Sequence, residues 1–199
     1  MAKQKISGIL LASGLSRRMN GQDKLLLEYR GKTLLEHALA LLDSLPCHEK
    51  IFVTTAQKIS GIAVPPAINT IINHNAHAGQ SESLRLGVKP ATGEGYLFLN
   101  ADQPLLTASM LEPMLSLAKE NPDKIIYPEI NGRPCTPVLF PARFRDALLK
   151  QTGDAGGRAV RLSNPQACLA FEVENPQDFM DIDNMEDYLR LCQSAGSQV

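Results

Sequence analysis

The strongest constraint on the fold is a short apolar segment near the N-terminus that stops at a glycine. Residues 6–12 (ISGILLA) are largely apolar, and Ser13-Gly14 follows at once. An apolar run of this length that ends in a glycine turn is typical of a buried strand followed by a loop. Apolar character returns at residues 25–27 (LLL), so the loop is bounded on both sides.

The loop between these apolar segments combines small residues with positive charge. Its small residues and cations are Ser13, Gly14, Ser16, Arg17, Arg18, Gly21 and Lys24. Small residues let backbone N–H groups approach an anion closely, and arginine and lysine balance the charge of phosphate oxygens. We therefore predict that the loop binds a polyphosphate, with an ordinary glycine turn and solvated cations as the alternative.

Two common phosphate-binding patterns are absent from the sequence. The chain has no G-x-x-x-x-G-K-[ST], and no G-x-G-x-x-G follows the first strand. A generic P-loop ATPase and a dinucleotide-dependent dehydrogenase are therefore disfavoured.

Composition indicates a globular protein of ordinary charge. The 199 residues carry a net charge of −1, with 44% hydrophobic and 21% charged residues. This balance argues against broad electrostatic capture of nucleic acid or of an anionic membrane. No segment approaches a membrane span, and the N-terminal apolar run is shorter than a signal-peptide core, so we expect a cytoplasmic protein. The four cysteines are scattered, which disfavours a zinc site or a disulfide framework.

Strand-like and helix-like segments alternate along the rest of the chain. Thr33 and Glu36 have the spacing of a capping box, and the following apolar residues have helical spacing to Leu45. Further strands are expected at residues 50–54, 69–72, 96–100, 124–127, 138–140 and 167–173, and further helices at residues 107–120, 144–149 and 185–192. Residues 128–137 and 153–158 are expected to be turn-rich or glycine-rich loops. This order indicates one α/β domain, residues 1–193, with a mostly parallel sheet covered by helices and a loose tail at 194–199.

Polar residues follow several of the expected strands. Asp102 comes directly after the apolar segment 96–100, where open α/β sheets bind ligands, and its carboxylate suits Mg²⁺; capping a turn before Pro104 is the alternative. Residues 79–85 (GQSESLR) are expected to lead into a helix. Its Ser81 or Ser83 could meet a nucleobase or phosphate, or only cap the helix.

Taken together, these motifs resemble the molybdenum-cofactor nucleotidyltransferases. The resemblance rests on LLASGLSRRMNGQDKLLL with GKTLLEHAL, and on NHNAHAGQSESLRLGV, NADQPLLT, GRPCTPVLF, GDAGGRAV and DIDNMEDY in the family's order. The chain is most similar to the cytidylyltransferase branch, which joins CMP to the pterin phosphate and releases pyrophosphate. The resemblance implies a Rossmann-like three-layer α/β/α sandwich and a Mg²⁺-dependent transferase that uses CTP.

The resemblance also implies roles for individual residues. For the nucleotide it implies Leu11, Ala12, Ser13, Gly14, Arg18, Lys24, Gly79 and Ser83. For the acceptor it implies Thr136 and the loop with Gly153, Asp154 and Arg158. The catalytic groups would be Arg18, Lys24 and Asp102, and the metal ligands Asp102 and Asp183, with Asp181 as a substitute for Asp183.

Two departures from the family pattern bear on specificity. Ser13 stands where cytidylyl enzymes usually carry alanine and guanylyl enzymes glycine, which favours CTP because serine is close to alanine in size. Cys135-Thr136-Pro137 replaces the family's Gly-His-Pro, so the acceptor is open: Cys135 is either a packed thiol or an acceptor contact. A sugar phosphate is the alternative acceptor. A non-catalytic protein that delivers molybdenum cofactor is the alternative from another class, and a xanthine-dehydrogenase-type apoenzyme is the client that the analogy suggests.

Overall fold

A central β-sheet organises the computed structural model, which describes residues 4–14 and 22–196. Its strands follow the order β10-β7-β9-β6-β1-β4-β5, and β8 pairs with β7 outside this path. The strands of the sheet are β1 (Ile6–Leu11), β4 (Glu49–Thr54), β5 (Ile68–Ile72), β6 (Gly95–Asn100), β7 (Ile125–Ile130), β8 (Arg133–Pro134), β9 (Val138–Pro141) and β10 (Cys168–Glu172). A separate hairpin consists of β2 (Glu28–Tyr29) and β3 (Lys32–Thr33).

Most neighbouring strands run parallel, as the sequence predicts. Strand β1 lies between β4 and β6 and is parallel to both, and β7 is parallel to β10. Only β8 and β9 introduce antiparallel pairs into this sheet. The carboxyl ends of β1, β4, β5 and β6 therefore meet at one edge, where open α/β sheets bind their ligands.

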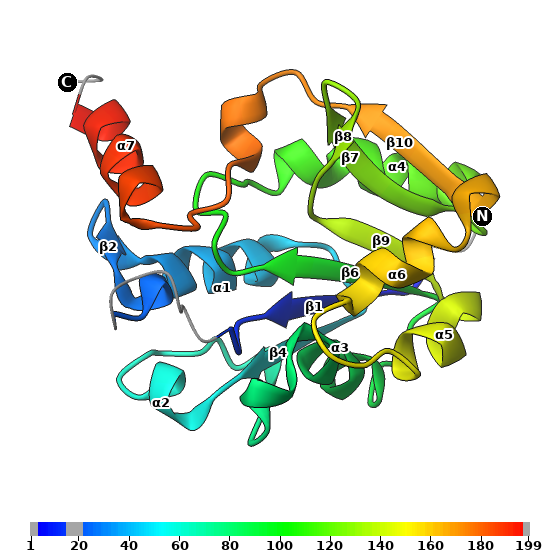
Figure 1. Cartoon of the computed structure of the whole chain (residues 1–199), viewed down its shortest axis with the longest axis horizontal. Helices are drawn as coiled ribbons and strands as arrows, with labels where there is room; N and C mark the ends of the chain where they lie inside the picture. Colours follow the sequence, from blue (N-terminus) through cyan, green and yellow to red (C-terminus); the bar gives the residue numbers. More distant parts are fainter. Residues whose placement is uncertain (1–3, 15–21, 197–199) are drawn as a thin grey trace.

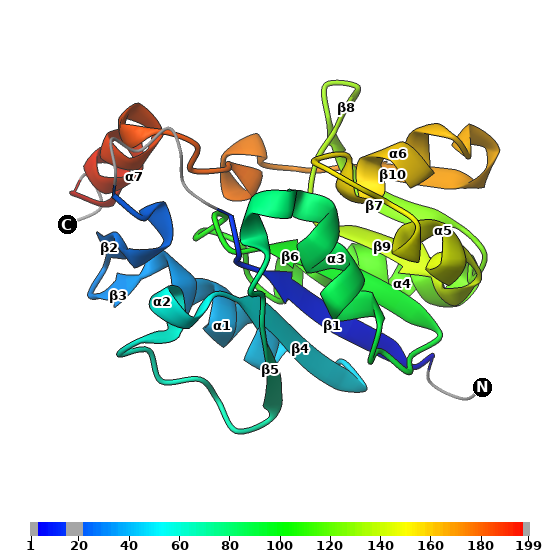
Figure 2. The ribbon, with the colours of Figure 1, turned by 60° about the horizontal axis from the view of Figure 1, so that its bottom comes forward.

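Helices cover both faces of the sheet (Figures 1 and 2). They are α1 (Leu34–Ser44), α2 (Ala56–Ile59), α3 (Gln80–Val88), α4 (Glu112–Glu120), α5 (Arg145–Leu149), α6 (Gly156–Leu162) and α7 (Met185–Gly196). Side chains of a strand alternate between its two faces. Leu10 accordingly packs in the core that includes α1 and α4, whereas its neighbour Ile9 packs in the core with α3, α5 and α6. This arrangement confirms the three-layer α/β/α prediction.

Helix α1 begins where its capping box requires. The Thr33 hydroxyl accepts a hydrogen bond from the backbone of Glu36 at 3.2 Å, and the Glu36 carboxylate accepts one from the backbone of Thr33 at 2.7 Å. These two bonds satisfy donors that the first turn would otherwise leave open. No helix in the described part of the chain combines the length and the apolar character needed to cross a membrane.

Three boundaries differ by three or more residues from those expected. Helix α4 begins at Glu112 rather than at Thr107, because Pro113 fits only the first turn of a helix. Strand β7 continues through Pro128 to Ile130, since β8 and β10 both pair with it beyond the expected end. Helix α7 runs to Gly196, past the expected end at Cys192 and into the first residues of the expected tail.

The glycine-rich segment expected as a loop over residues 153–158 is a loop only in its first half. Helix α6 begins at Gly156, although glycine is a weak helix former. Tertiary packing accounts for this helix: Val160 is buried in the core, and Gly157 lies so close to the Phe140 ring that a Cβ there would be 3.1 Å from it.

A carboxylate joins the amino ends of the central strands. Oε1 of Glu49 on β4 accepts hydrogen bonds from the hydroxyl of Ser7 on β1, at 2.6 Å, and from the backbone of Thr92, at 2.6 Å. It also accepts one from the backbone of Gly93 at 3.2 Å. Desolvation favours the neutral acid, but these hydrogen bonds outweigh it and leave the pKa of Glu49 lowered.

Candidate active site

A cavity of about 390 Å³ opens at the carboxyl ends of β1 and β6. It brings together nearly all residues for which the resemblance implies nucleotide or metal contacts, namely Leu11, Ala12, Ser13, Gly14, Lys24, Gly79, Ser83, Asp102 and Asp183. Arg18 lies outside the described residues. We call this space the nucleotide cavity.

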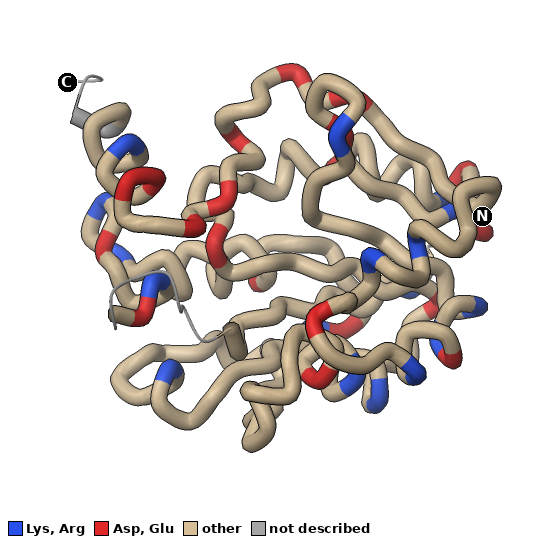
Figure 3. The backbone as a smooth tube through the Cα atoms, viewed as in Figure 1, with Lys and Arg blue, Asp and Glu red and all other residues tan. Residues whose placement is uncertain are grey.

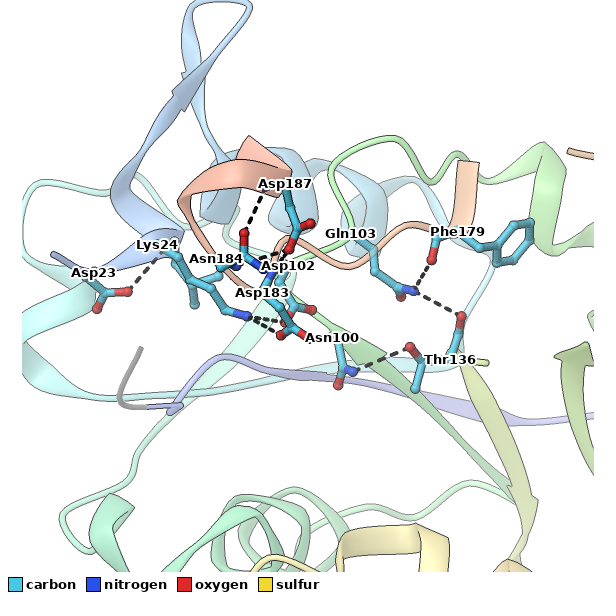
Figure 4. Close-up of polar contacts among 11 residues, drawn as sticks. Asp23, Lys24, Asn100, Asp102, Gln103, Thr136, Phe179, Asp183, Asn184 and Asp187 are labelled. Atoms are coloured by element: carbon cyan, nitrogen blue, oxygen red, sulfur yellow. Dashed lines mark hydrogen bonds and ion pairs between the residues drawn. The ribbon is translucent and has the colours of Figure 1, made fainter. Parts of the chain in front are cut away.

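Lys24 lies between the two acidic residues (Figure 4). Its Nζ is 2.7 Å from Oδ2 of Asp102 and 3.4 Å from Oδ1 of Asp183. Burial lowers the pKa of Lys24, but the charges and hydrogen bonds of the two aspartates outweigh burial and leave that pKa raised. The ammonium is therefore charged in the cavity at neutral pH, as phosphate binding requires.

A second lysine supports the segment that carries Lys24. Lys58 on α2 has a side chain only 4% exposed, and it forms an ion pair with Asp23. Asp23 also accepts a hydrogen bond from the backbone of Leu25 at 3.1 Å, which caps the short 3₁₀ turn Lys24–Leu26. Desolvation lowers the pKa of Lys58 despite the Asp23 carboxylate. The pair thus fixes the residue directly before Lys24, a role that the sequence did not reveal because an isolated lysine carries no signal.

The two acidic positions are joined through the backbone. The backbone N–H of Ile182 donates to the carbonyl of Asp102 at 2.9 Å, which places Asp183 beside the end of β6. Asn184 and Asp187 exchange hydrogen bonds at 3.0 and 3.1 Å, and the Asp187 carboxylate also accepts from the backbone of Asp183 at 3.1 Å. The start of α7 therefore holds Asp183 in place.

Asp181 occupies a different position from Asp183. It lines a neighbouring cavity, and its pKa is raised to about 7 by desolvation and by the charges of Asp102 and Asp183. Residues 181–183 belong to no strand, so the alternation of an extended chain, which would put residues 181 and 183 on one face, does not apply to them.

The donor set fits a divalent cation that shares its coordination with a substrate. Among the described residues, Oδ1 of Asp102 is buried without a hydrogen-bond partner, while the Asp183 side chain is 53% exposed. The described residues contain no cluster of three or more acidic, histidine or cysteine side chains that could hold a metal by themselves. Mg²⁺ typically takes one or two protein carboxylates and completes its shell with phosphate oxygens and water. Asp102 and Asp183 match that requirement.

A second cavity, of about 370 Å³, adjoins the first. Both cavities are lined by Leu11, Gln80 and Asn100, so they meet at the ends of β1 and β6. The second cavity has an apolar wall that includes Phe98 and Phe140, and it contains polar or charged residues, among them Cys135, Thr136, Arg158, Arg161 and Asp181. We call it the acceptor cavity.

The residues implied for the acceptor are divided between the two cavities. Thr136 and Arg158 line the acceptor cavity, whereas Asp154 lines the nucleotide cavity. Gly153 lines neither cavity: its carbonyl accepts a hydrogen bond from the backbone of Ser81 at 2.9 Å. The hydroxyl of Ser81 is also occupied, by the backbone N–H of Gly156 at 3.1 Å. Of the two serines considered in the sequence, only Ser83 lines the nucleotide cavity.

Gly79 permits the close contact between α3 and this loop. It has φ 96° and ψ 179°, a region open essentially to glycine alone. A Cβ at this position would lie 2.6 Å from the Gly153 carbonyl and from Oδ1 of Asp154. Gly79 therefore lets the start of α3 pack directly against the loop that precedes α6.

Several site residues carried no signal in the sequence. Gln103 is 2% exposed, and its amide donates to the carbonyls of Thr136, at 3.2 Å, and Phe179, at 3.0 Å (Figure 4). It thereby connects the acceptor cavity to the segment before Asp183. Arg161 lies one helical turn after Arg158, a spacing that would have indicated a basic helix face if α6 had been predicted.

Charges of both signs are interspersed along the chain in the view of Figure 3. The nucleotide cavity itself places one lysine among three carboxylates, those of Asp102, Asp154 and Asp183. Among its described lining residues, negative charge therefore exceeds positive charge. A divalent cation would balance part of that charge when a nucleotide binds.

Comparison with known proteins identifies the family of this chain. The model of the MobA-like NTP transferase domain matches residues 8–167. Molybdenum cofactor guanylyltransferase of Shewanella sediminis is 24% identical and aligns over 96% of this chain and 97% of its own length. Nicotine blue oxidoreductase of Paenarthrobacter nicotinovorans is 27% identical, over 94% and 96% of the two chains.

Solved structures show the same fold. Rv0371c of Mycobacterium tuberculosis superposes with a TM-score of 0.81 at 22% identity, and covers 97% of this chain and 100% of its own. A manganese complex of that protein superposes with a TM-score of 0.76 at 21% identity, over 96% and 99%. Because the family model spans most of the chain, and because a charged cavity lies where α/β sheets bind nucleotides, this protein belongs to the MobA-like NTP transferases and is a nucleotidyltransferase.

Proposed function

We propose that the protein transfers CMP from CTP to the phosphate of molybdenum cofactor, with Mg²⁺ and with release of pyrophosphate. The observation that carries the proposal is the junction of the two cavities at Leu11, Gln80 and Asn100. A nucleotide in one cavity and a phosphorylated acceptor in the other would have their reacting groups at this junction. The similarity to molybdenum cofactor guanylyltransferases supports the pterin acceptor.

In the nucleotide cavity, Lys24 binds the triphosphate. Its ammonium lines the nucleotide cavity and is paired there with Asp102 and Asp183. Asp102 and Asp183 would hold Mg²⁺, which supplies Lewis acidity toward the phosphate oxygens. Arg18 belongs to the same loop and is proposed as the second phosphate-binding cation.

The reaction needs little from the protein beyond position and charge. The acceptor phosphate attacks the α-phosphorus in line, a P–O bond forms, and the bond to the leaving pyrophosphate breaks. A phosphate nucleophile is already ionised at neutral pH, so no general base is required. Lys24 stabilises negative charge that grows on the phosphate oxygens, and the junction of the cavities aligns the two substrates.

Ser13 supports CTP as the donor. The residue is 3% exposed and lines the nucleotide cavity, where its side chain occupies space that a glycine would leave for a larger base. Within the described part of the chain, its hydroxyl is buried without a hydrogen-bond partner, and a contact with the nucleoside would satisfy it. A pyrimidine suits the smaller space better than guanine does.

The acceptor cavity supports a flat, partly apolar acceptor that carries an anion. Its apolar wall includes Phe98 and Phe140, and the guanidinium groups of Arg158 and Arg161 can bind a phosphate. Cys135 lines this cavity, and its thiol donates a hydrogen bond to the Arg133 carbonyl at 3.4 Å. Desolvation raises the pKa of this thiol, which keeps it neutral beside the acceptor. A sugar phosphate remains the second candidate, because Cys135 stands in the segment that departs from the family pattern.

The deciding experiment measures pyrophosphate release with Mg²⁺, from CTP, GTP, ATP and UTP, each with and without molybdenum-loaded molybdopterin. The proposal expects release from CTP that requires the pterin. Release from GTP would refute the role of Ser13, and release only with a sugar phosphate would replace the acceptor. Tight binding without turnover would favour a delivery protein. Because one relative is named nicotine blue oxidoreductase, the assay includes an arm with nicotine blue, in which turnover would contradict the proposal.

Substitution of Lys24 tests the site directly. Lys24→Ala is expected to lower the rate of pyrophosphate release by about 100-fold or more, the usual loss when one group that stabilises transition-state charge is removed. Lys119→Ala on the exposed face of α4 removes the same charge away from the cavity and should leave the rate unchanged. Equal rates for the two variants would show that Lys24 has no catalytic role.

A further inference from the structure

A buried asparagine contacts the wall of the nucleotide cavity. Ser83 on α3 lines this cavity, and the residue is 5% exposed. Its Oγ lies 3.1 Å from Nδ2 of Asn73, which follows β5 and is 3% exposed. Neither residue is an ordinary surface group, and the bond between them is buried.

The orientation of the asparagine amide is fixed by a second hydrogen bond. The backbone N–H of Asn75 lies 2.8 Å from Oδ1 of Asn73. A backbone N–H can only donate, so the atom that it faces must be the amide oxygen. The atom that faces Ser83 is therefore the NH₂ nitrogen, which can only donate. The backbone of Asn73 is itself held, because its N–H donates to the Thr54 carbonyl at 2.7 Å.

This arrangement sets the polarity of the Ser83 hydroxyl. A hydroxyl has one hydrogen to donate and two lone pairs to accept with. The amide of Asn73 occupies a lone pair of Ser83, so the hydroxyl hydrogen must point elsewhere. Within the described part of the chain, no hydrogen bond uses that hydrogen. The open side of the residue is the nucleotide cavity.

We propose that Asn73 makes Ser83 a hydrogen-bond donor to the nucleobase, and thereby selects a base that presents an acceptor at this point. The inference rests on the proposed function, in which this cavity holds the nucleotide. Cytosine fits the requirement at N3, which is an acceptor, whereas O2 is an acceptor in uracil as well and would not distinguish the two pyrimidines. Uracil has a proton on N3, and guanine has protons on N1 and on its 2-amino group. Ser83 is the specificity-determining contact, and Asn73 is the positioning residue that acts through it.

Asn73→Asp reverses this polarity almost without a change of shape. One oxygen of the new carboxylate still accepts from the Asn75 backbone, while the other accepts the Ser83 hydrogen. Ser83 then presents only lone pairs to the cavity. We expect the dissociation constant of CTP to rise about tenfold, and the ratio of CTP to UTP affinity to fall by a similar factor. A merely structural defect would weaken both nucleotides alike and leave that ratio unchanged.

Three further variants make the test specific. Ser83→Ala removes the donor without altering β5 and should lose the CTP preference to a similar extent. Adding Asn73→Asp to Ser83→Ala should change the affinity less than twofold, because no hydroxyl is left to reverse. Asn69→Asp places the same charge at an exposed position of β5 and should have no effect.

The measurement is titration calorimetry of each variant with CTP and UTP in the presence of Mg²⁺, with urea unfolding to confirm that each variant is folded. If the wild-type protein binds CTP but Ser83→Ala keeps the wild-type ratio of CTP to UTP affinity, this inference is overturned and the proposed function stands. Absence of any nucleotide binding by the wild-type protein would overturn the proposed function, and the inference with it. If Asn73→Asp does not fold, the Ser83→Ala ratio decides.

Discussion

Lys58 and Asp23 form an ion pair beneath the segment that carries Lys24, and Lys58→Met removes one of its charges. Methionine retains the length of the aliphatic chain, so the change is mainly electrostatic. The Lys58 side chain is 4% exposed and that of Asp23 is 27% exposed. Loss of one partner of a fully buried pair costs about 3–5 kcal/mol. Because Asp23 keeps partial contact with water, we expect Lys58→Met to lower the free energy of unfolding by about 2 kcal/mol.

A double-mutant cycle separates the pair from other effects. Asp23→Asn preserves an acceptor for the Leu25 backbone N–H but leaves the buried ammonium of Lys58 without its anion, and should cost about 3 kcal/mol. The double variant buries no uncompensated charge at this site and should cost about 2 kcal/mol less than the sum of the single changes.

Urea unfolding measures these free energies. In a thermal scan, Lys58→Met should lower the melting temperature by about 4–8 °C for a chain of this size. The same variant should raise the KM for the nucleotide, because Asp23 positions Lys24. Lys58→Arg keeps the charge and should recover most of both losses. Strictly additive free energies, or a Lys58→Met variant as stable as the wild-type protein, would refute the reasoning.

Further predictions concern the loop contact, the acid response and the acceptor cavity. Gly79→Ala should destabilise the fold by about 3 kcal/mol, because the new Cβ collides with the loop at Asp154 and alanine avoids the backbone angles found at this position. Urea unfolding measures this loss, and an unchanged unfolding midpoint would contradict it. The lowered pKa of Glu49 means that the unfolded chain binds the proton more tightly, so stability that is present at neutral pH is lost as the pH falls through the folded-state pKa. Glu49→Gln should cost about 1–3 kcal/mol at pH 7 and flatten the acid dependence of the unfolding midpoint, whereas an unaltered dependence would exclude this role. Arg158→Gln and Arg161→Gln should each raise the KM for the acceptor without changing the KM for the nucleotide, and steady-state kinetics with both substrates distinguish this from an effect on the nucleotide cavity.

The sequence by itself determined the features that depend on neighbouring residues. The apolar run that stops at Ser13-Gly14 predicted β1, and the Thr33 and Glu36 pattern predicted the start of α1. Strand and helix periodicity then implied a mostly parallel sheet covered by helices, and the resemblance to the family implied the three-layer sandwich. Asp102 was identified as a site candidate because a residue that follows a buried strand of a parallel sheet lies at the edge where such sheets bind ligands.

Only the tertiary structure decided what depends on residues far apart in the chain. The strand order placed β9 antiparallel beside β6, and packing against Phe140 turned a glycine-rich segment into α6. The pairing of Lys58 with Asp23 and the direction of the Asn73 hydrogen bond likewise join residues that no local pattern connects. Local sequence fixes backbone preferences over a few residues. Charge partners and hydrogen-bond polarity instead depend on which distant segments the folded sheet brings together.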